Sequence, residues 1–436
     1  MRKVMMFLMV LALTFTFAVP AFALENIFGG YWRTRAYMQK DFSGNDQDEA
    51  RDLQIVDTRT RLYYTAKFND NFKFVNKFEM DAYWGSGNSG YGDIGADGVK
   101  VEVKNSYADM TFDKTNLKIG VQGATLNRGF MFDDDFAGAV VTYNVSDTLS
   151  IPFIWVKAYE GYNAYWDDPK DKSLNDEDVD YYGIYPTIKA GNATVKPIFL
   201  WVSSDKPGTW FSEEFDPTEM TDPAAGVSIE NLDLYYLGFD ADLPVGPATV
   251  WMTGIYEFGS FDMITSTDES SVDVGAYLLA LGASADVNKL NVHGQIFYAS
   301  GQDPDEEDMT QFTGPIGQSY YWSEIMGYGI FDEDVSNGSC ADRIRDIMAA
   351  NIGVTVKPTD KLSLTGDLWF AQLAEDNANG DKDLGTEIDL IASYSVLDNV
   401  TLDAVFAYLF AGDATTGGSS DDADPMEVGM QLSFGF

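Results

Sequence analysis

Cysteine and histidine are almost absent from this chain of 436 residues, which contains one of each. The single cysteine, Cys340, excludes an internal disulfide bond, and we expect a lone loop thiol to be inert. The single histidine, His293, has no nucleophile near it in the sequence at the spacing that a Ser-His hydrolase requires. We therefore expect a protein that is not an enzyme, with His293 facing inward as a plain lining residue.

Basic residues are also scarce. Lys and Arg together number 28 against 69 Asp and Glu, so the formal net charge is −41. Nucleic-acid binding requires a basic surface that displaces counterions from the phosphates, so this composition excludes nucleic acid as a partner. Cations are instead the natural companions of such an acidic chain.

Long apolar runs are absent after the N-terminus. The one such run, residues 4–19, follows Arg2 and Lys3 and precedes Ala21-Phe22-Ala23. This pattern predicts a cleaved secretory signal peptide over residues 1–23 and a mature chain over residues 24–436. After the signal peptide, no stretch approaches the ~20 apolar residues of a spanning helix, which excludes a helical membrane protein.

What the sequence does contain is alternation. In residues 56–84, apolar and polar side chains occupy alternate positions on both sides of an Asn-Asp-Asn turn. Period two on both sides of a turn predicts a β-hairpin. If the turn is centred on Asp70, then Arg61 lies opposite Glu79 and Arg59 opposite Asp81, so opposite charges meet across the strands.

The alternation recurs along the chain and predicts about eighteen strands, with sixteen as the alternative count. Eight short connections are rich in Asn, Asp, Gly and Pro and predict tight turns; they lie near residues 69–71, 113–116, 145–148, 190–192, 243–248, 286–289, 358–361 and 397–399. Nine longer connections alternate with them, near residues 40–52, 85–98, 123–138, 160–178, 203–231, 259–271, 301–348, 375–385 and 411–424.

This pattern predicts an all-β fold: a transmembrane antiparallel up-and-down β-barrel with short periplasmic turns and long acidic extracellular loops. A soluble β-sandwich is the alternative, but it has no reason to separate short and long connections so evenly. Strands of about a dozen residues also exceed the usual ~5–6. They suit a tilted membrane-spanning strand of ~9–11 residues with an overhang.

The closing strand shows the clearest alternation, with apolar residues at every even position from 426 to 436. The signal peptide, the alternating strands and the final LSFGF resemble Gram-negative outer-membrane porins. The resemblance implies an outer-membrane location, in contact with lipid and lipopolysaccharide. It also implies that the terminal Phe436 is part of the signal read by the barrel assembly machinery. Porins of this size occur as monomers and as homotrimers, so the oligomeric state stays open.

Residues 117–138 resemble the porin pattern of a fifth strand followed by a loop that folds into the pore. The candidate constriction loop, residues 123–138, carries Arg128 and the acidic run Asp133, Asp134 and Asp135. Rings of charged side chains are a known filter device. The alternative is that Phe130, Phe132 and Phe136 only anchor this loop to the rim. Whether this loop or residues 301–348 enters the lumen is open.

Four arginines form a candidate pore-lining basic strip, with Arg33 and Arg35 on the first strand and Arg59 and Arg61 on the second. Guanidinium groups stay charged and bind carboxylates and phosphates, so the strip is expected to influence ion selectivity. The alternative is structural neutralisation by the facing acids, which are Asp57, Glu79 and Asp81. We expect Arg33 and Arg35 to remain uncompensated, because cross-strand pairs cancel the other two.

Acidic clusters occupy other predicted loops: Asp46, Asp48, Glu49 and Asp52; Asp167, Asp168, Asp171, Asp176, Glu177 and Asp178; Asp303, Asp305, Glu306, Glu307 and Asp308. Oxygen ligands at this density suit calcium, but solvated loops of like charge are the simpler interpretation. Residues 375–380 depart from a calcium-loop pattern at the first and last ligand positions. We therefore expect no cofactor, with calcium at these loops as the alternative.

The predicted function is that of an outer-membrane porin, a water-filled channel for passive diffusion of small hydrophilic solutes and ions. One alternative is a substrate-specific channel: stacked aromatic side chains in the lumen would favour sugars, whereas the basic strip favours sugar acids or other anions. Another alternative is a closed barrel that acts as a surface adhesin or scaffold, with residues 301–348 as its working part. Conductance separates these hypotheses.

Overall fold

A computed structural model of the chain describes residues 24–87, 92–95, 100–160, 178–205, 207, 228–264, 269–418 and 421–436. The predicted signal peptide, residues 1–23, lies outside the described residues. So do five members of the second acidic cluster, which are Asp167, Asp168, Asp171, Asp176 and Glu177.

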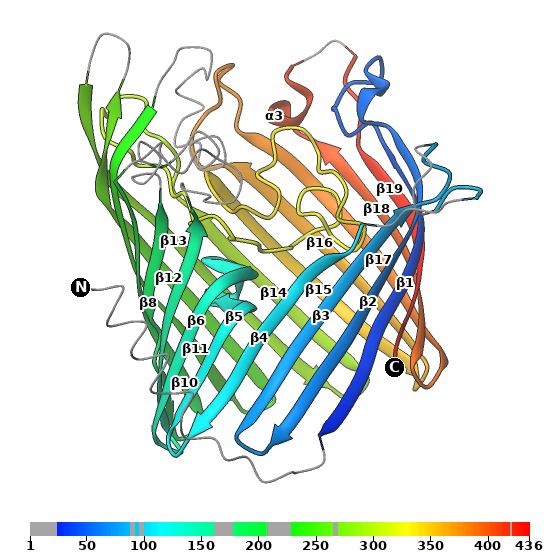
Figure 1. The fold of residues 1–436 in the computed structure, drawn as a ribbon. Coiled ribbons are helices and arrows are strands. Elements are labelled where there is room, and N and C mark those ends of the chain that lie inside the picture. Colours follow the sequence, from blue (N-terminus) through cyan, green and yellow to red (C-terminus); the bar gives the residue numbers. More distant parts are fainter. Residues whose placement is uncertain are drawn as a thin grey trace.

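The described chain forms one closed antiparallel barrel (Figure 1). Its strand segments are β1 (Glu25–Lys40), β2 (Leu53–Asn69), β3 (Phe72–Tyr83), β4 (Glu102–Phe112), β5 (Thr115–Leu126), β6 (Phe132–Ser146), β7 (Leu149–Tyr159), β8 (Val179–Ile184), β9 (Thr187–Ala190), β10 (Ala193–Ser204), β11 (Ser228–Val245), β12 (Ala248–Ile264), β13 (Glu269–Val287), β14 (Leu290–Ala299), β15 (Ile347–Thr359), β16 (Leu362–Leu373), β17 (Asp383–Leu397), β18 (Val400–Ala411) and β19 (Met426–Gly435). The barrel closes because β1 pairs with β2 on one side and with β19 on the other.

Segments β8 and β9 are two halves of one barrel strand. Both pair with β7 on one side and with β10 on the other. The break between them contains Pro186, whose nitrogen carries no hydrogen and cannot donate to the ladder. The barrel formed by the described residues therefore has eighteen strands, which confirms the predicted fold class and count.

The short turns also lie where the sequence predicts them. All eight predicted tight turns join consecutive strands, from the connection between β2 and β3 to that between β17 and β18. The helices of the described residues are η1 (Glu49–Arg51), η2 (Asn127–Gly129) and α3 (Asp413–Thr416). None of them is long and apolar enough to cross a membrane.

Two predicted long loops are wrong, because the strands on either side extend through most of each. Within residues 123–138, β5 continues to Leu126 and β6 begins at Phe132, with Thr125 paired to Asp133. Within residues 259–271, β12 and β13 pair as far as Ile264 and Glu269. Acidic residues at both sites look like loop residues in the sequence, but they occupy regular ladder positions.

The outer surface of the barrel is apolar, as a bilayer requires. On β13 the outward Tyr277, Leu279 and Leu281 are 43, 56 and 47% exposed. On β14 the outward Val292 and Ile296 are similarly exposed. Such a surface on a closed sheet, in which every strand is paired, is the form in which β-structure crosses a membrane.

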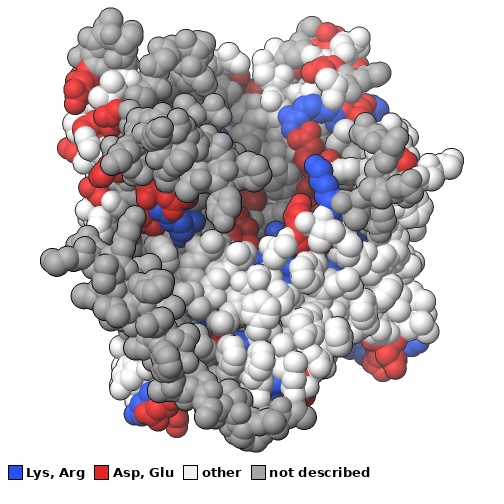
Figure 2. Space-filling view, in the orientation of Figure 1, with Lys and Arg blue, Asp and Glu red and all other residues white. Residues whose placement is uncertain are grey.

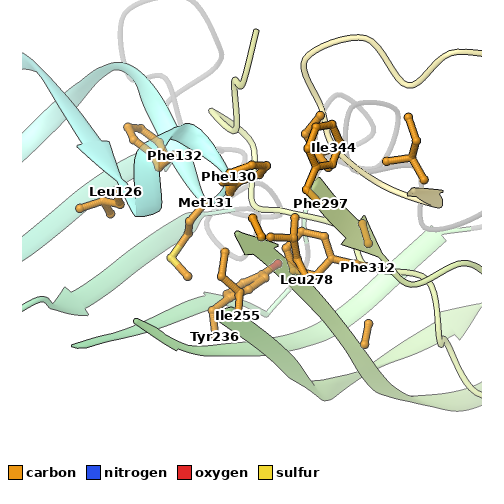
Figure 3. Packing of buried hydrophobic residues seen from close by; sticks show 14 of the residues in the cluster. Leu126, Phe130, Met131, Phe132, Tyr236, Ile255, Leu278, Phe297, Phe312 and Ile344 are labelled. Carbon is orange, nitrogen blue, oxygen red and sulfur yellow. The ribbon is translucent and has the colours of Figure 1, made fainter. Parts of the chain in front are cut away.

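The inner face is apolar along part of the wall, which a simple water-filled barrel would not require. On β13, Ala276, Leu278 and Ala280 face inward and are buried. Figure 3 shows the packing that covers this wall, where Phe130 and Met131 from the β5–β6 hairpin approach Leu278 and its neighbours. A hydrophobic core therefore lies inside the barrel, between the wall and segments that fold into it.

Candidate functional site: the barrel lumen

The connection between β14 and β15, residues 300–346, crosses the lumen and is called the inserted segment. Figure 1 shows it in yellow inside the upper part of the barrel. Its far end reaches β1, where the Phe331 ring stacks on the Tyr37 ring with centroids 4.7 Å apart and planes 9° apart. The structure therefore answers the question left open by the sequence, because this segment enters the lumen.

Arg35 fastens the inserted segment to β1. Its guanidinium donates to the backbone oxygens of Ile330 and Phe331, at 3.0 and 2.8 Å. The same side chain pairs with Asp57 of β2 at 2.5 Å and with Asp332 of the segment. Arg35 is only 4% exposed, so these partners compensate a charge that water does not reach.

The expectation that Arg33 and Arg35 remain uncompensated is therefore wrong. Arg33 also pairs with Asp332, at 3.4 Å. Asp332 lies far in the sequence from the β1–β2 hairpin, because it belongs to the inserted segment. Cross-strand geometry alone gives no indication of this aspartate.

Two wall carboxylates hold other parts of the inserted segment. Glu387 of β17 accepts hydrogen bonds from the backbone N–H groups of Ile325 and Met326, at 2.7 and 3.0 Å. Glu257 of β12 accepts one from the N–H of Thr313 at 2.8 Å. Both glutamates are fully buried. The alternation of their strands places them inward, but the sequence offers no signal that they bind backbone groups of a distant loop.

A second element, the tip of the β5–β6 hairpin, also projects into the lumen. It turns through η2, where Asn127, Arg128 and Gly129 all have positive φ. Figure 3 shows Phe130 and Met131 next to this turn, pointing toward the wall. Arg128 bridges to that wall by pairing with Asp242 of β11 at 2.5 Å and lying 4.8 Å over the Trp251 ring.

This tip modifies the predicted constriction loop. Only residues 127–131 separate the two strands, so Asp133, Asp134 and Asp135 lie on β6 and not on a loop. Phe130, Phe132 and Phe136 are buried in the core inside the barrel, so they do anchor the hairpin. The charged residues of this hairpin nevertheless face the lumen, because Arg128 and all three aspartates line the same cavity.

That cavity, called the charged cavity, has a volume of about 1200 Å³. It lies between the β2–β6 wall and the inserted segment. Its charged lining residues are Arg59, Arg61, Lys77, Lys104, Lys118, Arg128 and Arg343, and Glu79, Asp81, Glu102, Asp133, Asp134, Asp135, Asp332 and Asp342. Figure 2 shows basic and acidic side chains around a hollow at the upper end of the molecule.

Four of the wall charges in the charged cavity are paired as the hairpin register predicts. Arg61 lies opposite Glu79 and Arg59 opposite Asp81. Arg59 binds Asp81 at 2.6 Å, and Arg61 binds Glu79. Lys104 of β4 binds Asp135 of β6, across the intervening β5, at 3.0 Å. The cross-strand pairing centred on Asp70 is confirmed.

Uncompensated positive charge is found on β3 and β5 instead of β1. Lys77 of β3 makes no ion pair with any described residue. Lys118 of β5 likewise has no carboxylate partner among them, and its ammonium lies 5.8 Å from the Tyr107 ring centroid. These two lysines line the charged cavity and were not singled out in the sequence, because nothing there separates them from paired lysines.

A second cavity of about 380 Å³ lies between the inserted segment and β12–β17. His293 and Asp367 line it, with His293 Nε2 at 3.0 Å from Asp367 Oδ1. Asn351 donates to the same carboxylate oxygen at 2.7 Å. His293 therefore faces inward as predicted. Tyr321 of the inserted segment lines both cavities and marks where they meet.

Burial changes the proton affinity of several groups on the inserted segment. It raises the pKa of Glu324 to about 7, with smaller contributions from the nearby Glu387 and Asp367 carboxylates. Burial also raises the pKa of Cys340 to about 11, so little thiolate forms at neutral pH. This agrees with the expectation that Cys340 is inert.

The acidic loops bind their own backbone. Asp303 accepts a hydrogen bond from the N–H of Asp305, and Asp48 accepts one from the N–H of Ala50. Within the described ranges, no three His, Cys, Asp or Glu side chains converge as metal ligands. Calcium binding by these loops stays a prediction.

The closing residue completes the seam of the barrel. Phe436 exchanges two backbone hydrogen bonds with Gly30 of β1, at 2.9 and 3.2 Å. Its ring is 63% exposed on the outer surface. Its role as an assembly signal stays a prediction.

No protein-family model and no curated protein matches the sequence. Solved structures do match. OpdK of Pseudomonas aeruginosa, in a crystal structure with vanillate, shares 12% identity over 94% of this chain and 98% of its own, with a TM-score of 0.55. OccAB3 of Acinetobacter baumannii shares 10% identity over 94% of this chain and 100% of its own, with a TM-score of 0.56. The outer membrane protein OprD of P. aeruginosa shares 10% identity over 94% of this chain and 93% of its own, with a TM-score of 0.53. At these identities the likeness shows the fold, a closed barrel of the type found in these bacterial outer membrane proteins.

Proposed function

We propose that the chain is a porin of the bacterial outer membrane, a channel for passive diffusion of small hydrophilic solutes and ions. The observation that carries this proposal is the charged cavity, because a lumen of about 1200 Å³ lined by polar and charged groups offers a hydrated route through an apolar-coated barrel. The inserted segment and the hairpin tip occupy part of the lumen and leave this cavity beside the wall.

The location is supported by two independent features. The described barrel has an apolar exterior and no unpaired strand edge, which suits a bilayer. OprD, which shares the fold, is an outer membrane protein. Outer-membrane lipid and lipopolysaccharide are the surroundings that follow from this location, and the barrel assembly machinery is the partner that would insert the chain.

Conductance of the purified barrel in planar bilayers under a salt gradient tests this function. A porin gives discrete current steps, and the reversal potential reports which sign of ion passes more readily. A membrane that stays silent although folded barrel has inserted would favour the adhesin or scaffold alternative, in which the inserted segment closes the lumen.

A second function, selective transport of small organic anions, is favoured by one specific observation. Lys77 and Lys118 present uncompensated ammonium groups to the charged cavity. An unpaired cation in a confined, partly desolvated lumen attracts carboxylates more strongly than one in bulk water. OpdK, of the same fold, has been crystallised with vanillate, which is a carboxylate.

Block of the channel current by benzoate tests selectivity for such anions. A selective channel shows concentration-dependent block that weakens when Lys77 and Lys118 are both replaced by alanine. Replacing Lys114, which lies in the short turn between β4 and β5, provides the matched control. Equal, weak block of the wild type, the Lys77 and Lys118 double variant and the Lys114 variant would leave passive diffusion as the function.

A further inference from the structure

The second cavity differs from the charged cavity in the chemistry of its lining. No lysine and no arginine lines it, whereas seven line the charged cavity. Its volume of about 380 Å³ falls within the range of about 300–1,000 Å³ typical of small-molecule sites. A carboxylate or phosphate solute finds no counter-charge here, so the ligand class proposed for the charged cavity does not fit.

Aromatic side chains supply the apolar surface of the second cavity. Trp322 of the inserted segment and Trp369 of β16 meet edge to face, with ring centroids 5.3 Å apart and planes 71° apart. Both tryptophans are buried, at 8 and 3% exposed, and the Arg128 guanidinium lies over Trp251, so the open aromatic face at this cavity is that of Tyr321, which is 49% exposed. Flat aromatic faces beside polar groups suit a ring that has apolar C–H surfaces and a polar rim.

Polar groups line the same cavity as a connected network. Asp367 binds both His293 and Asn351, and the Asn351 side-chain oxygen accepts the N–H of Gln295 at 2.9 Å. The Gln295 side chain in turn accepts the Tyr320 hydroxyl at 2.6 Å. The network thus fixes amide, imidazole and carboxylate groups in one place, where they present both donors and acceptors.

Two further lining residues belong to the wall of the cavity and not to its open surface. Asp389 and Ser323 are both 3% exposed, and both form side-chain hydrogen bonds with Glu387. The polar groups that a solute can reach are therefore those of the Asp367 network.

A cationic ligand fits this cavity less well. The Trp251 face is already covered by the Arg128 guanidinium at 4.8 Å, and the two other tryptophans meet edge to face instead of forming a cage. The Glu324 carboxylate is engaged by the N–H of Ile330 at 2.8 Å. The polar groups that remain suit hydroxyl groups better than an ammonium.

We propose that the second cavity binds a neutral polyhydroxylated solute of the sugar class, with Tyr321 against the ring and Asp367, Asn351 and His293 binding its hydroxyls. The proposal rests on the proposed channel function and adds a solute class to it. Tyr321 lines both cavities, so the subsite lies directly beside the charged cavity.

Glucose block of single-channel current is the test. Glucose added to a conducting channel should interrupt the current in a concentration-dependent way. Tyr321→Ala should weaken glucose affinity about tenfold, because it removes the stacking surface, and Asp367→Asn should weaken it while keeping a side chain of the same shape. Trp201→Ala is the matched control, since this tryptophan lies on the outer face of β10 and binds Asp233; it should leave block unchanged.

Other results would overturn the proposal or the function on which it rests. Absence of glucose block in a channel that conducts would overturn the sugar subsite alone. Stronger block by choline than by glucose, lost in Tyr321→Ala, would overturn it in favour of a cation site. A silent membrane would overturn the channel function instead, and glucose titration of the folded barrel in detergent, followed by tryptophan fluorescence, would then decide the subsite: saturable binding lost in Asp367→Asn supports it, and no binding overturns it.

Discussion

The ring of Phe331, at the far end of the inserted segment, stacks on the ring of Tyr37 on β1 at 4.7 Å. Next to this stack, Arg35 holds the backbone of the segment and pairs with Asp332. On the opposite wall Glu257 of β12 accepts a hydrogen bond from the backbone N–H of Thr313 in the same segment. The inserted segment is therefore held at both sides of the lumen, and its attachments determine how wide the passage is.

Arg35→Ala should release the far end of the inserted segment. The substitution leaves Asp57 and Asp332 without their main cation, and removing one partner from a buried pair costs about 3–5 kcal/mol. We expect larger or more variable current steps and faster amide exchange around residue 331. Arg59→Ala is the control. Arg59 also lines the cavity, but its ion pair with Asp81 joins two wall strands. Equal behaviour of the two variants would contradict the fastening role of Arg35.

Glu387→Ala should loosen the middle of the inserted segment. It leaves the buried N–H groups of Ile325 and Met326 without an acceptor, at about 1–3 kcal/mol each. Limited proteolysis within residues 300–346 should become faster, while the barrel itself stays heat-modifiable. If the cleavage rate is unchanged, Glu387 does not hold the segment.

The packing of the inserted segment should weaken as pH rises. Glu324 ionises with an ordinary pKa of 4.5 when the segment is released, but only near pH 7 when it is packed. The packed form therefore binds more protons between these values. The contribution of Glu324 protonation to the stability of the packed segment is about 3 kcal/mol in total. It is complete below pH 4.5, falls between pH 4.5 and pH 7, and is lost above pH 7.

Hydrogen exchange of the inserted segment at pH 5 and pH 8 measures this dependence. The wild type should exchange more slowly at pH 5, after correction for the intrinsic exchange rate. Glu324→Gln should remove most of the difference, because the amide does not titrate. If Glu324→Gln shows the same difference in exchange rate between pH 5 and pH 8 as the wild type, the pH dependence comes from other groups.

Lys77 and Lys118 should determine the anion preference of the lumen at high salt. The acidic outer loops attract cations, but salt screens them over ~8–10 Å at physiological ionic strength and over shorter distances above it. Replacing both lysines by alanine should move the high-salt reversal potential toward cations. The double variant of Arg33 and Arg35 should move it less, since those arginines are paired. The opposite order would show that Asp332 does not neutralise them.

Deleting Phe436 should reduce the amount of folded barrel in the outer membrane. The terminal residue completes the seam with Gly30 and resembles the porin assembly signal. The heat-modifiable band on a gel measures the amount of folded barrel. Phe436→Tyr is the control: it keeps an aromatic terminus and should assemble normally. Unchanged assembly of the deletion would remove this role.

The strands and their register could be predicted from the sequence because each depends on neighbouring residues. Period-two alternation defines the two faces, and turn residues fix where each hairpin reverses. The pairing of Arg61 with Glu79 follows from these local rules and is present. The interruption at Pro186, which divides one barrel strand into β8 and β9, was not anticipated, but it follows from the missing N–H.

The contents of the lumen could not be predicted in the same way. Residues 300–346 have no periodicity, so nothing in them indicates that Asp332 reaches Arg35 or that Ile325 reaches Glu387. The apolar inner face of β13 is visible in the sequence as loss of alternation, with Leu278 and Leu279 adjacent. That signal indicates that something packs inside the barrel, but not which segment does so.

The most direct test of the account is the conductance of the barrel with and without the inserted segment. Residues 303–343 would be replaced by a short Gly-Ser linker, and the folded variant and the wild type would be compared in planar bilayers. The account predicts small current steps for the wild type and several times larger steps for the variant, because the segment narrows a conducting lumen. Steps of equal size, or a wild type and a variant that both remain silent after insertion, would contradict it.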